Sequence, residues 1–228
     1  MKTMQWLKEN WLQVVILAVP LIVIAAAWDR FPDKVAVHWG GDGIPNRWEN
    51  KAKGLLYVPL LNIAVAILLG WIPSLDPRLR RDPDASERSI AAIGVFRMAT
   101  TLLMAAGSLV IATEALGYHF NILRAGMNLV LLFFIVMGNY FGSIRPNYFI
   151  GIRTPWTLES DEVWRATHRI TGRILVFGSL LFLGLQFVVK LSYVMPCFLG
   201  FIVASMAWSV GYSYWLYRSV GASRQPPR

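Results

Sequence analysis

The stretch AGMNLVLLFFIVMGNYFGSI, residues 125–144, contains no Asp, Glu, Lys or Arg. Its length of 20 residues matches the roughly 20 residues that an α-helix needs to cross the hydrocarbon layer of a membrane. Lipid offers the backbone no hydrogen-bond partner, so the N–H and C=O groups of such a segment have to be paired within a helix. The stretch therefore predicts a transmembrane helix.

The sequence on both sides of this stretch is also rich in hydrophobic residues and poor in charged ones. Of its 228 residues, 56% are hydrophobic and 15% are charged, whereas soluble domains carry about 25% charged residues. We therefore expect an all-α, polytopic integral membrane protein with about six transmembrane helices, organised as a single membrane domain over residues 1–228. The predicted spans are residues 11–28, 54–73, 98–117, 125–144, 172–189 and 194–217.

Positive charge gathers at the ends of these apolar runs and accounts for a formal net charge of +9. This clustering favours contact with anionic lipids over direct binding of nucleic acid. Lys and Arg are usually in excess on the cytoplasmic side of a membrane. Of the 22 Lys and Arg residues, 15 fall in segments on the same side as both termini, so we expect both termini in the cytoplasm.

That orientation places residues 29–53 in an extracytoplasmic loop, called the outer loop below. Apolar and other residues alternate over 35–39, which is typical of a short strand, and Gly40-Gly41-Asp42-Gly43 favours a turn. We expect an ordered loop that presents candidate ligand-binding side chains. These are His38, Trp39, Asp42, Asn46, Trp48 and Lys51.

Two other interpretations of the outer loop remain open. A metal site would use His38 and Asp42, but complete sites usually have three or four ligands, so we expect no metal or other cofactor. Alternatively, Trp39 and Trp48 hold the loop on the membrane surface without binding any ligand. The single cysteine, Cys197, cannot form an internal disulfide.

The cytoplasmic connection at residues 138–173, called the signature segment below, is more specific. Its second part reads RPNYFIGIRTPWTLESDEVWRATHRITGR, residues 145–173. Ser160 is placed to cap an amphipathic helix that begins at Asp161 and continues into the fifth span. The candidate partner-binding residues of the segment are Asn139, Arg145, Asn147, Arg153, Trp156, Trp164, His168 and Arg173.

A simpler interpretation of the signature segment is also open. Its arginines, which include Arg165, Arg169 and Arg173 at intervals of four, would anchor helix ends at the headgroups. Trp156 and Trp164 would lie at headgroup depth, where indole rings are common.

The order of residues in this segment is more distinctive than its composition. Gly138-Asn139-Tyr140, Arg145-Pro146-Asn147, Gly151 to Thr157, Trp164, Thr167-His168 and Gly172-Arg173 together resemble the signature of the SdpI family of bacterial membrane proteins. The outer loop, through Pro32, Val37-His38-Trp39, Gly43, Pro45-Asn46 and Lys51, is similar to a small domain of unknown function found at the N-terminus of the same proteins.

The resemblance implies a location in the bacterial cytoplasmic membrane and a role in immunity against a secreted peptide toxin. It also implies signalling, in which a cytoplasmic transcriptional repressor is held at the membrane once toxin is present. Such coupling requires that the toxin bind two states of the protein differently.

Two other classes of function were weighed against this one. A transporter would use polar groups in or near the spans, such as Asn62, Glu114, Asn128 and Gln186, but no pair of broken helices is evident in the sequence. An enzyme is not expected, because no nucleotide-binding loop, His-Glu-x-x-His motif or Gly-x-Ser-x-Gly elbow is present. His168 beside Trp164 and Asp161 lacks a positioned nucleophile.

Overall fold

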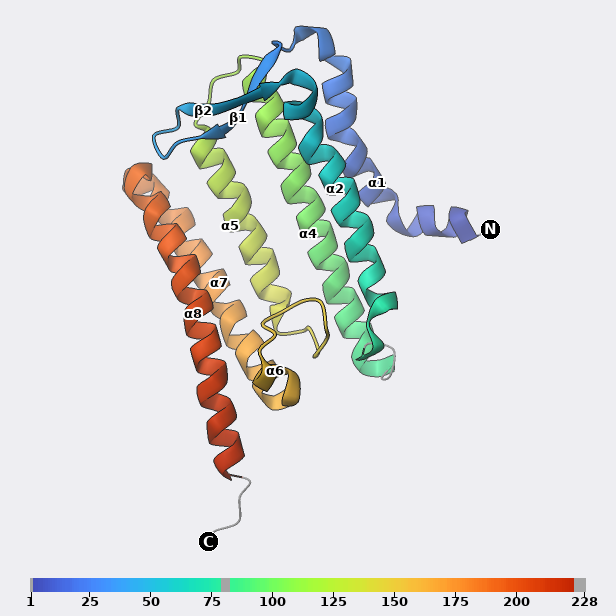
Figure 1. The fold of residues 1–228 in the computed structure, drawn as a ribbon, viewed down its shortest axis with the longest axis vertical. Helices are drawn as coiled ribbons and strands as arrows, with labels where there is room; N and C mark the ends of the chain where they lie inside the picture. The colour runs from blue at the N-terminus through green and yellow to red at the C-terminus, as the bar shows by residue number, and fades with distance from the viewer. Residues whose placement is uncertain (1, 79–82, 224–228) are drawn as a thin grey trace. The chain divides into compact units, whose positions relative to one another are not determined.

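The structure, a computed structural model, describes residues 2–78 and 83–223 (Figure 1). Within them the chain forms seven α-helices and one two-stranded antiparallel sheet. The helices are α1 (Lys2–Ala26), α2 (Lys51–Leu75), α4 (Pro83–Ala115), α5 (Ile122–Phe141), α6 (Pro155–Glu159), α7 (Asp161–Val188) and α8 (Leu191–Ser223), with a single 3-10 turn, η1 (Trp28–Arg30), after α1. The strands are β1 (Lys34–Trp39) and β2 (Pro45–Asn50).

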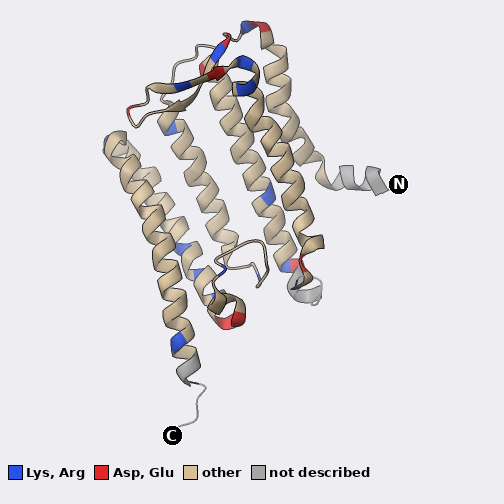
Figure 2. Ribbon diagram, viewed as in Figure 1, with Lys and Arg blue, Asp and Glu red and all other residues tan. Residues whose placement is uncertain are grey.

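Five of the described helices are long and apolar enough to cross a membrane. They are α2, the Glu87–Ala115 part of α4, α5, α7 and the Leu191–Val220 part of α8, and Asn10–Ala26 of α1 adds a shorter apolar helix. Charged residues gather at the ends of α5, α7 and α8, and the lengths between are uncharged (Figure 2). The prediction of an all-α polytopic membrane protein is confirmed.

The chain divides into two compact units. The first comprises Met1–Leu69 and Arg97–Phe133, and the second comprises Gly70–Phe96 and Phe134–Arg228. The outer loop belongs to the first unit and the signature segment to the second.

In the first unit, the β-hairpin of residues 34–50 is held on the helices by its first strand. Val35 is 1% exposed and lies in an apolar cluster with Ile24, Phe31 and Leu55. The first turn of α2 passes close beneath β1, and a Cβ atom at Gly54 would lie 2.2 Å from Val35 Cγ2. The absence of a side chain at Gly54 is therefore what allows the strand to approach the helix.

In the second unit, α7 and α8 lie side by side (Figure 1). Small hydroxyl side chains join them, since Thr171 donates to Ser209 over 2.8 Å. A Cβ atom at Gly178 would lie 2.0 Å from the ring of Phe201, so this glycine makes room for an aromatic side chain of α8. Small residues are the usual means by which membrane helices approach closely.

Candidate functional site

The turn between α5 and α6 is organised by the buried side chain of Asn147. Its amide nitrogen donates to the backbone oxygens of Arg145 and Ile150, over 3.0 and 2.9 Å. Its amide oxygen accepts from the backbone N–H groups of Phe149 and Ile150, over 2.9 and 2.7 Å. One fully buried side chain thus satisfies four backbone groups of an irregular loop, which would otherwise be costly to bury.

The same turn is also held by residues that directly follow α2. Asp76 is fully buried, and its carboxylate accepts from the backbone N–H of Tyr148 over 2.7 Å and of Arg78 over 2.8 Å. The guanidinium of Arg78 lies over the ring of Tyr148 and donates twice to the backbone oxygen of Leu158, each over 3.2 Å. The loop is therefore held from both sides.

The two helices of the signature segment begin at well-formed caps. Thr154 caps α6, and Pro155 occupies the first turn of that helix. The side chain of Thr154 accepts from the backbone N–H of Thr157, and the side chain of Thr157 accepts from the backbone N–H of Thr154. Ser160 accepts from the backbone N–H of Val163 and caps α7, as the sequence predicts. Trp156 of α6 donates its indole N–H to Ser213 of α8 over 2.6 Å.

Trp164 and His168 form the centre of the segment. Both are 0% exposed, and their rings stack with centroids 4.0 Å apart. Trp164 donates its indole N–H to the backbone oxygen of Ile144 over 2.7 Å. The ring of Phe141, on α5, lies 4.7 Å from the imidazole. The pair therefore fastens α7 to the end of α5 and to the loop that follows it.

The hydrogen bonds of His168 define its tautomer. Nε2 accepts from the backbone N–H of Ile152 over 2.9 Å, and Nδ1 lies 2.8 Å from the backbone oxygen of Trp164. Because the first partner can only donate and the second can only accept, the ring is neutral with its proton on Nδ1. Both nitrogens are thus occupied by backbone partners, so neither is available for acid–base chemistry in this conformation.

Gly151 is the residue that lets the loop close over these rings. Its φ angle is +121°, in a region that side chains strongly disfavour. A Cβ atom there would lie 2.4 Å from His168 Nε2 and 3.0 Å from the ring of Trp164. Both the backbone angle and the space require glycine.

Three glycines bring α5 and α7 into contact. A Cβ atom at Gly138 would lie 2.6 Å from the backbone oxygen of Gly172, and a Cβ atom at Gly172 would lie 2.4 Å from that of Gly138. Directly after the end of α5, a Cβ atom at Gly142 would lie 3.3 Å from Arg169 Cα. Gly138 and Gly142 have the four-residue spacing common at close contacts between membrane helices.

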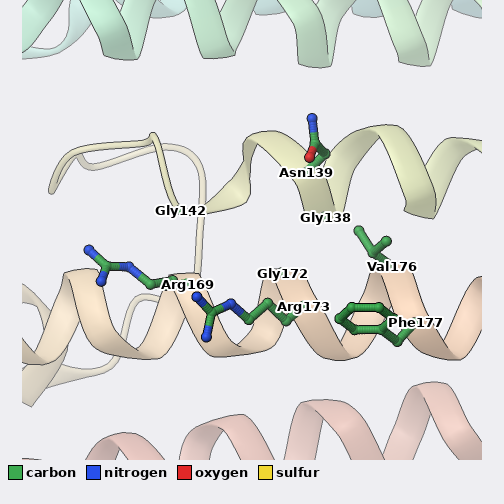
Figure 3. Close-up of a pocket in the computed structure, with 8 residues that line it drawn as sticks. All are labelled: Gly138, Asn139, Gly142, Arg169, Gly172, Arg173, Val176 and Phe177. Carbon is green, nitrogen blue, oxygen red and sulfur yellow. The ribbon is translucent and has the colours of Figure 1, made fainter.

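Beside this contact lies a pocket of about 320 Å³ (Figure 3). Asn139, Arg169 and Arg173 supply its polar groups, and the guanidinium groups of the two arginines extend in the same direction along α7. All three side chains belong to exposed residues. The complete lining is Gly138, Asn139, Gly142, Arg169, Gly172, Arg173, Val176 and Phe177.

The other arginines of the signature segment differ in the hydrogen bonds that they make. The backbone N–H of Arg145 donates to Ser89 of α4 over 3.0 Å. Arg153 is exposed and donates to the backbone oxygen of Tyr148. Within the described parts of the chain, Arg165 shows neither a hydrogen bond nor an ion pair from its side chain.

On the outer loop, three of the six candidate residues contribute to the hairpin itself. His38 Nδ1 lies 2.6 Å from the side-chain oxygen of Asn46, across the two strands. Asp42 accepts from the backbone N–H of Ile44 over 3.0 Å and shapes the turn, where Gly43 has a φ angle of +81°. Over residues 2–78 and 83–223, no group of three or more His, Cys, Asp or Glu side chains could hold a metal ion.

The remaining candidates of the outer loop are differently placed. Lys51 is tied down, since its ammonium donates to the backbone oxygen of Trp28 over 3.2 Å and lies 5.0 Å above the indole ring. Trp39 is half-buried, whereas Trp48 is 55% exposed. Among the six candidates, Trp48 is therefore the large apolar side chain most open for contact.

Charged side chains of β2 and α2 border a second pocket, of about 430 Å³, which is lined in part by Val37, Tyr57 and Ile111. Glu49 accepts from Arg47 over 3.0 Å and from Lys53 over 3.1 Å. The hydrogen bonds from Lys53 and then Arg47 lower the pKa of Glu49 below its ordinary value of 4.5.

The structure corrects one interpretation made from the sequence. Trp164 is not an exposed anchor that faces the headgroups, because it is buried among Phe96, Ile144 and His168 within the protein. Sequence reasoning also missed Asp76, whose signal is a carboxylate directly after the apolar run of α2 and before Pro77. Ser213, a residue of α8 that contacts the signature segment, could not be identified from any local sequence pattern.

Comparison with known proteins identifies two matching regions. Residues 143–213 match the SdpI/YfhL protein family, and residues 15–63 match a domain of unknown function (DUF1648). The chain is 23% identical over 228 residues to Immunity protein SdpI of Bacillus subtilis (strain 168). The aligned region covers 96% of this chain and 100% of that relative. No solved structure shows a significant match.

The matched regions coincide with the two loops singled out in the sequence. The DUF1648 match includes the whole hairpin, and the SdpI/YfhL match includes the turn at Asn147, Gly151 and the stacked Trp164 and His168. The resemblance seen in the sequence is thereby confirmed: this membrane protein carries the SdpI/YfhL family region in residues 143–213 and is related along its length to an immunity protein of that kind.

Proposed function

We propose that this chain gives its cell resistance to a secreted antimicrobial peptide toxin. The supporting observation is the similarity to Immunity protein SdpI, which extends over 96% of this chain and all of that relative. It includes both the hairpin and the signature segment, so the proposal does not depend on one shared motif. The site of action is the bacterial cytoplasmic membrane, with both termini in the cytoplasm.

The toxin binds, in this proposal, at the hairpin. Trp48 and Ile44 are 55% and 63% exposed there, and large apolar side chains on a polar surface are typical of a contact site. His38, Trp39, Asp42, Asn46 and Lys51 shape the surface around them. The neighbouring pocket of about 430 Å³ offers Tyr57 and Ile111 for apolar side chains of a peptide.

The signature segment takes the cytoplasmic role. Its exposed Arg153 and Arg165 can pair with carboxylates of a partner such as a transcriptional repressor. The buried residues Asn147, Trp164 and His168, with the half-buried Trp156, would act by holding that surface in shape. Relay of a signal requires that toxin favour one of two arrangements of the protein.

Expression in a toxin-sensitive bacterium tests the central proposal. The wild-type protein should raise the inhibitory concentration of at least one secreted peptide toxin, and Trp48→Ala should lower that protection. The matched control is Trp215→Ala, which removes a 62% exposed indole from α8. Protection by none of a panel of such peptides, from protein present in the membrane at normal level, would remove the proposal.

Orientation is tested separately by labelling from outside the cell. In a Cys197→Ser background, Trp48→Cys should react with a membrane-impermeant thiol reagent and Arg153→Cys should not. Reaction of both positions, or only of Arg153→Cys, would contradict the placement of both termini in the cytoplasm.

A further inference from the structure

The pocket beside the α5–α7 contact is a hollow made by missing side chains. Gly138, Gly142 and Gly172 bring the helix backbones together, and the two guanidinium-bearing residues of α7 form its rim (Figure 3). Gly138 and Gly172 are buried, so the floor of the hollow is helix backbone. Its volume of about 320 Å³ is within the range of small-ligand sites, roughly 300–1,000 Å³.

The polar end of the hollow carries positive charge that none of the described side chains neutralises. In the described part of the chain, neither Arg169 nor Arg173 has a carboxylate within ion-pair distance, and the ion pairs found there involve Glu49. Asn139, on α5, also lines the pocket, but its amide points away from the two arginines (Figure 3). Two guanidinium groups that no described carboxylate pairs with are suited to a phosphate group.

The other end of the hollow is apolar. Val176 and Phe177 line it, and Phe177 is 70% exposed. After Arg173, residues 174–188 of α7 carry no charge and extend roughly 22 Å at 1.5 Å per residue. A hydrocarbon layer is about 30 Å thick, so all of this uncharged length fits within it, and Phe177 belongs to the apolar part of α7 whereas Arg173 belongs to its charged end.

We infer that this hollow binds one anionic phospholipid. The phosphate lies against the guanidinium groups of Arg169 and Arg173, and an acyl chain runs over Val176 and Phe177. A soluble phosphate compound would use only the polar end, and it would leave the apolar wall without a function. The inference concerns the signature segment alone and does not depend on the proposed resistance to toxin.

The test measures lipid bound to the purified full-length chain by native mass spectrometry. The probes are phosphatidylglycerol, phosphatidylcholine and inorganic phosphate, and the variant is R169Q/R173Q. Arg165→Gln is the matched control, because it removes the same kind of charge one turn away on α7 and outside the pocket lining. Each protein is checked for a normal elution profile and normal tryptophan fluorescence.

The wild-type protein and Arg165→Gln should retain one phosphatidylglycerol in preference to phosphatidylcholine. R169Q/R173Q should bind it about tenfold more weakly, because two charge-assisted contacts to the phosphate are lost. Retention of phosphatidylglycerol by the double variant at the level of Arg165→Gln would overturn the inference. So would equal binding of phosphatidylcholine, or protection against thermal unfolding by inorganic phosphate as strong as that by phosphatidylglycerol.

Discussion

The hairpin and the signature segment are both irregular parts of a helical membrane protein, but their polar residues have different tasks. In the hairpin, His38, Asn46 and Asp42 are exposed and make single hydrogen bonds. In the signature segment, Asn147 and His168 are fully buried and satisfy two or more backbone groups each. One surface is open to variation, whereas the other is built from residues that have few substitutes.

This difference changes how the distinctive residues of the signature segment should be interpreted. A buried asparagine or histidine in this setting maintains the fold, and its loss would disturb any partner surface indirectly. The side chains left to meet other molecules are the exposed arginines, together with Trp48 and Ile44 of the hairpin. Substitutions can separate these two groups, because the first should change stability and the second should change binding.

The largest effect is expected for Gly151→Ala. The new methyl group would meet His168 Nε2 and the ring of Trp164, at a φ angle of +121°. Backbone strain and overpacking together should cost about 3 kcal/mol or more in the free energy of unfolding. The measurement is unfolding of the purified protein in detergent, followed by fluorescence.

Gly94→Ala is the control for this substitution. Gly94 also belongs to the second unit, but no atom lies within 4 Å of a Cβ placed there. It should leave the stability unchanged or slightly raised, because alanine favours helix over glycine. Equal behaviour of Gly151→Ala and Gly94→Ala would show that the loop does not close over the stacked rings as described.

The second largest effect is expected for Asn147→Ala. Four hydrogen bonds disappear, and backbone groups of Arg145, Phe149 and Ile150 are left buried without partners. The expected loss is about 3 kcal/mol, since each buried unpaired group costs about 1–3 kcal/mol and the loop can relax in part. Asn147→Asp keeps the acceptor but sets a buried carboxylate against the backbone oxygens of Arg145 and Ile150, so it should not restore the lost stability. Wild-type stability of either variant in a thermal unfolding series would contradict this account.

The sequence predicts the membrane spans well because they depend on length and on the absence of charge, and both are local properties. The described helices α2 and α8 extend only a few residues beyond the predicted spans 54–73 and 194–217, and α5 begins and ends a few residues before the predicted bounds of 125–144. The cap at Ser160 is equally local, because it needs only a hydroxyl before an acidic first turn.

The internal bonding of the signature segment could not be predicted in the same way. Trp164 looks like an interfacial anchor in sequence, because an indole near a helix end is common at the headgroups. Its partner Ile144 lies 20 residues earlier in the chain, and the partner of Trp156 lies 57 residues later. Such pairings depend on how helices approach one another, which the glycines at 138, 142 and 172 decide.

A smaller effect is expected when an asparagine of the hairpin, and not of the signature segment, is replaced by alanine. Asn46→Ala removes the contact with His38, but both side chains are exposed, so water replaces the lost hydrogen bond. The global stability should fall by no more than about 1 kcal/mol. Amide hydrogen exchange should increase at residues 40–46 and remain unchanged in the signature segment. A loss as large as that of Asn147→Ala would remove the contrast between the two regions.

The smallest effect concerns the charged network of the hairpin. Hydrogen bonds from Lys53 and Arg47 lower the pKa of Glu49, so this carboxylate favours the folded state above its ordinary pKa of 4.5. That contribution disappears as the pH falls through the lowered pKa, because the folded protein must then take up a proton that breaks both contacts. Its size is limited by solvent, since the Lys53 and Arg47 side chains are 58% and 67% exposed.

Titration of Glu49 by carboxylate NMR should show this directly. Lys53→Ala should raise the pKa of Glu49 more than Arg47→Ala does, because the bond from Lys53 is the larger of the two causes. Lys34→Ala is the matched control, since it removes a charge from β1 without removing a hydrogen bond to Glu49. If all three variants shifted the titration equally, the effect would come from the general positive field of the hairpin and not from the two contacts. The hairpin would then lack fixed charge pairs altogether, and its difference from the signature segment would be greater still.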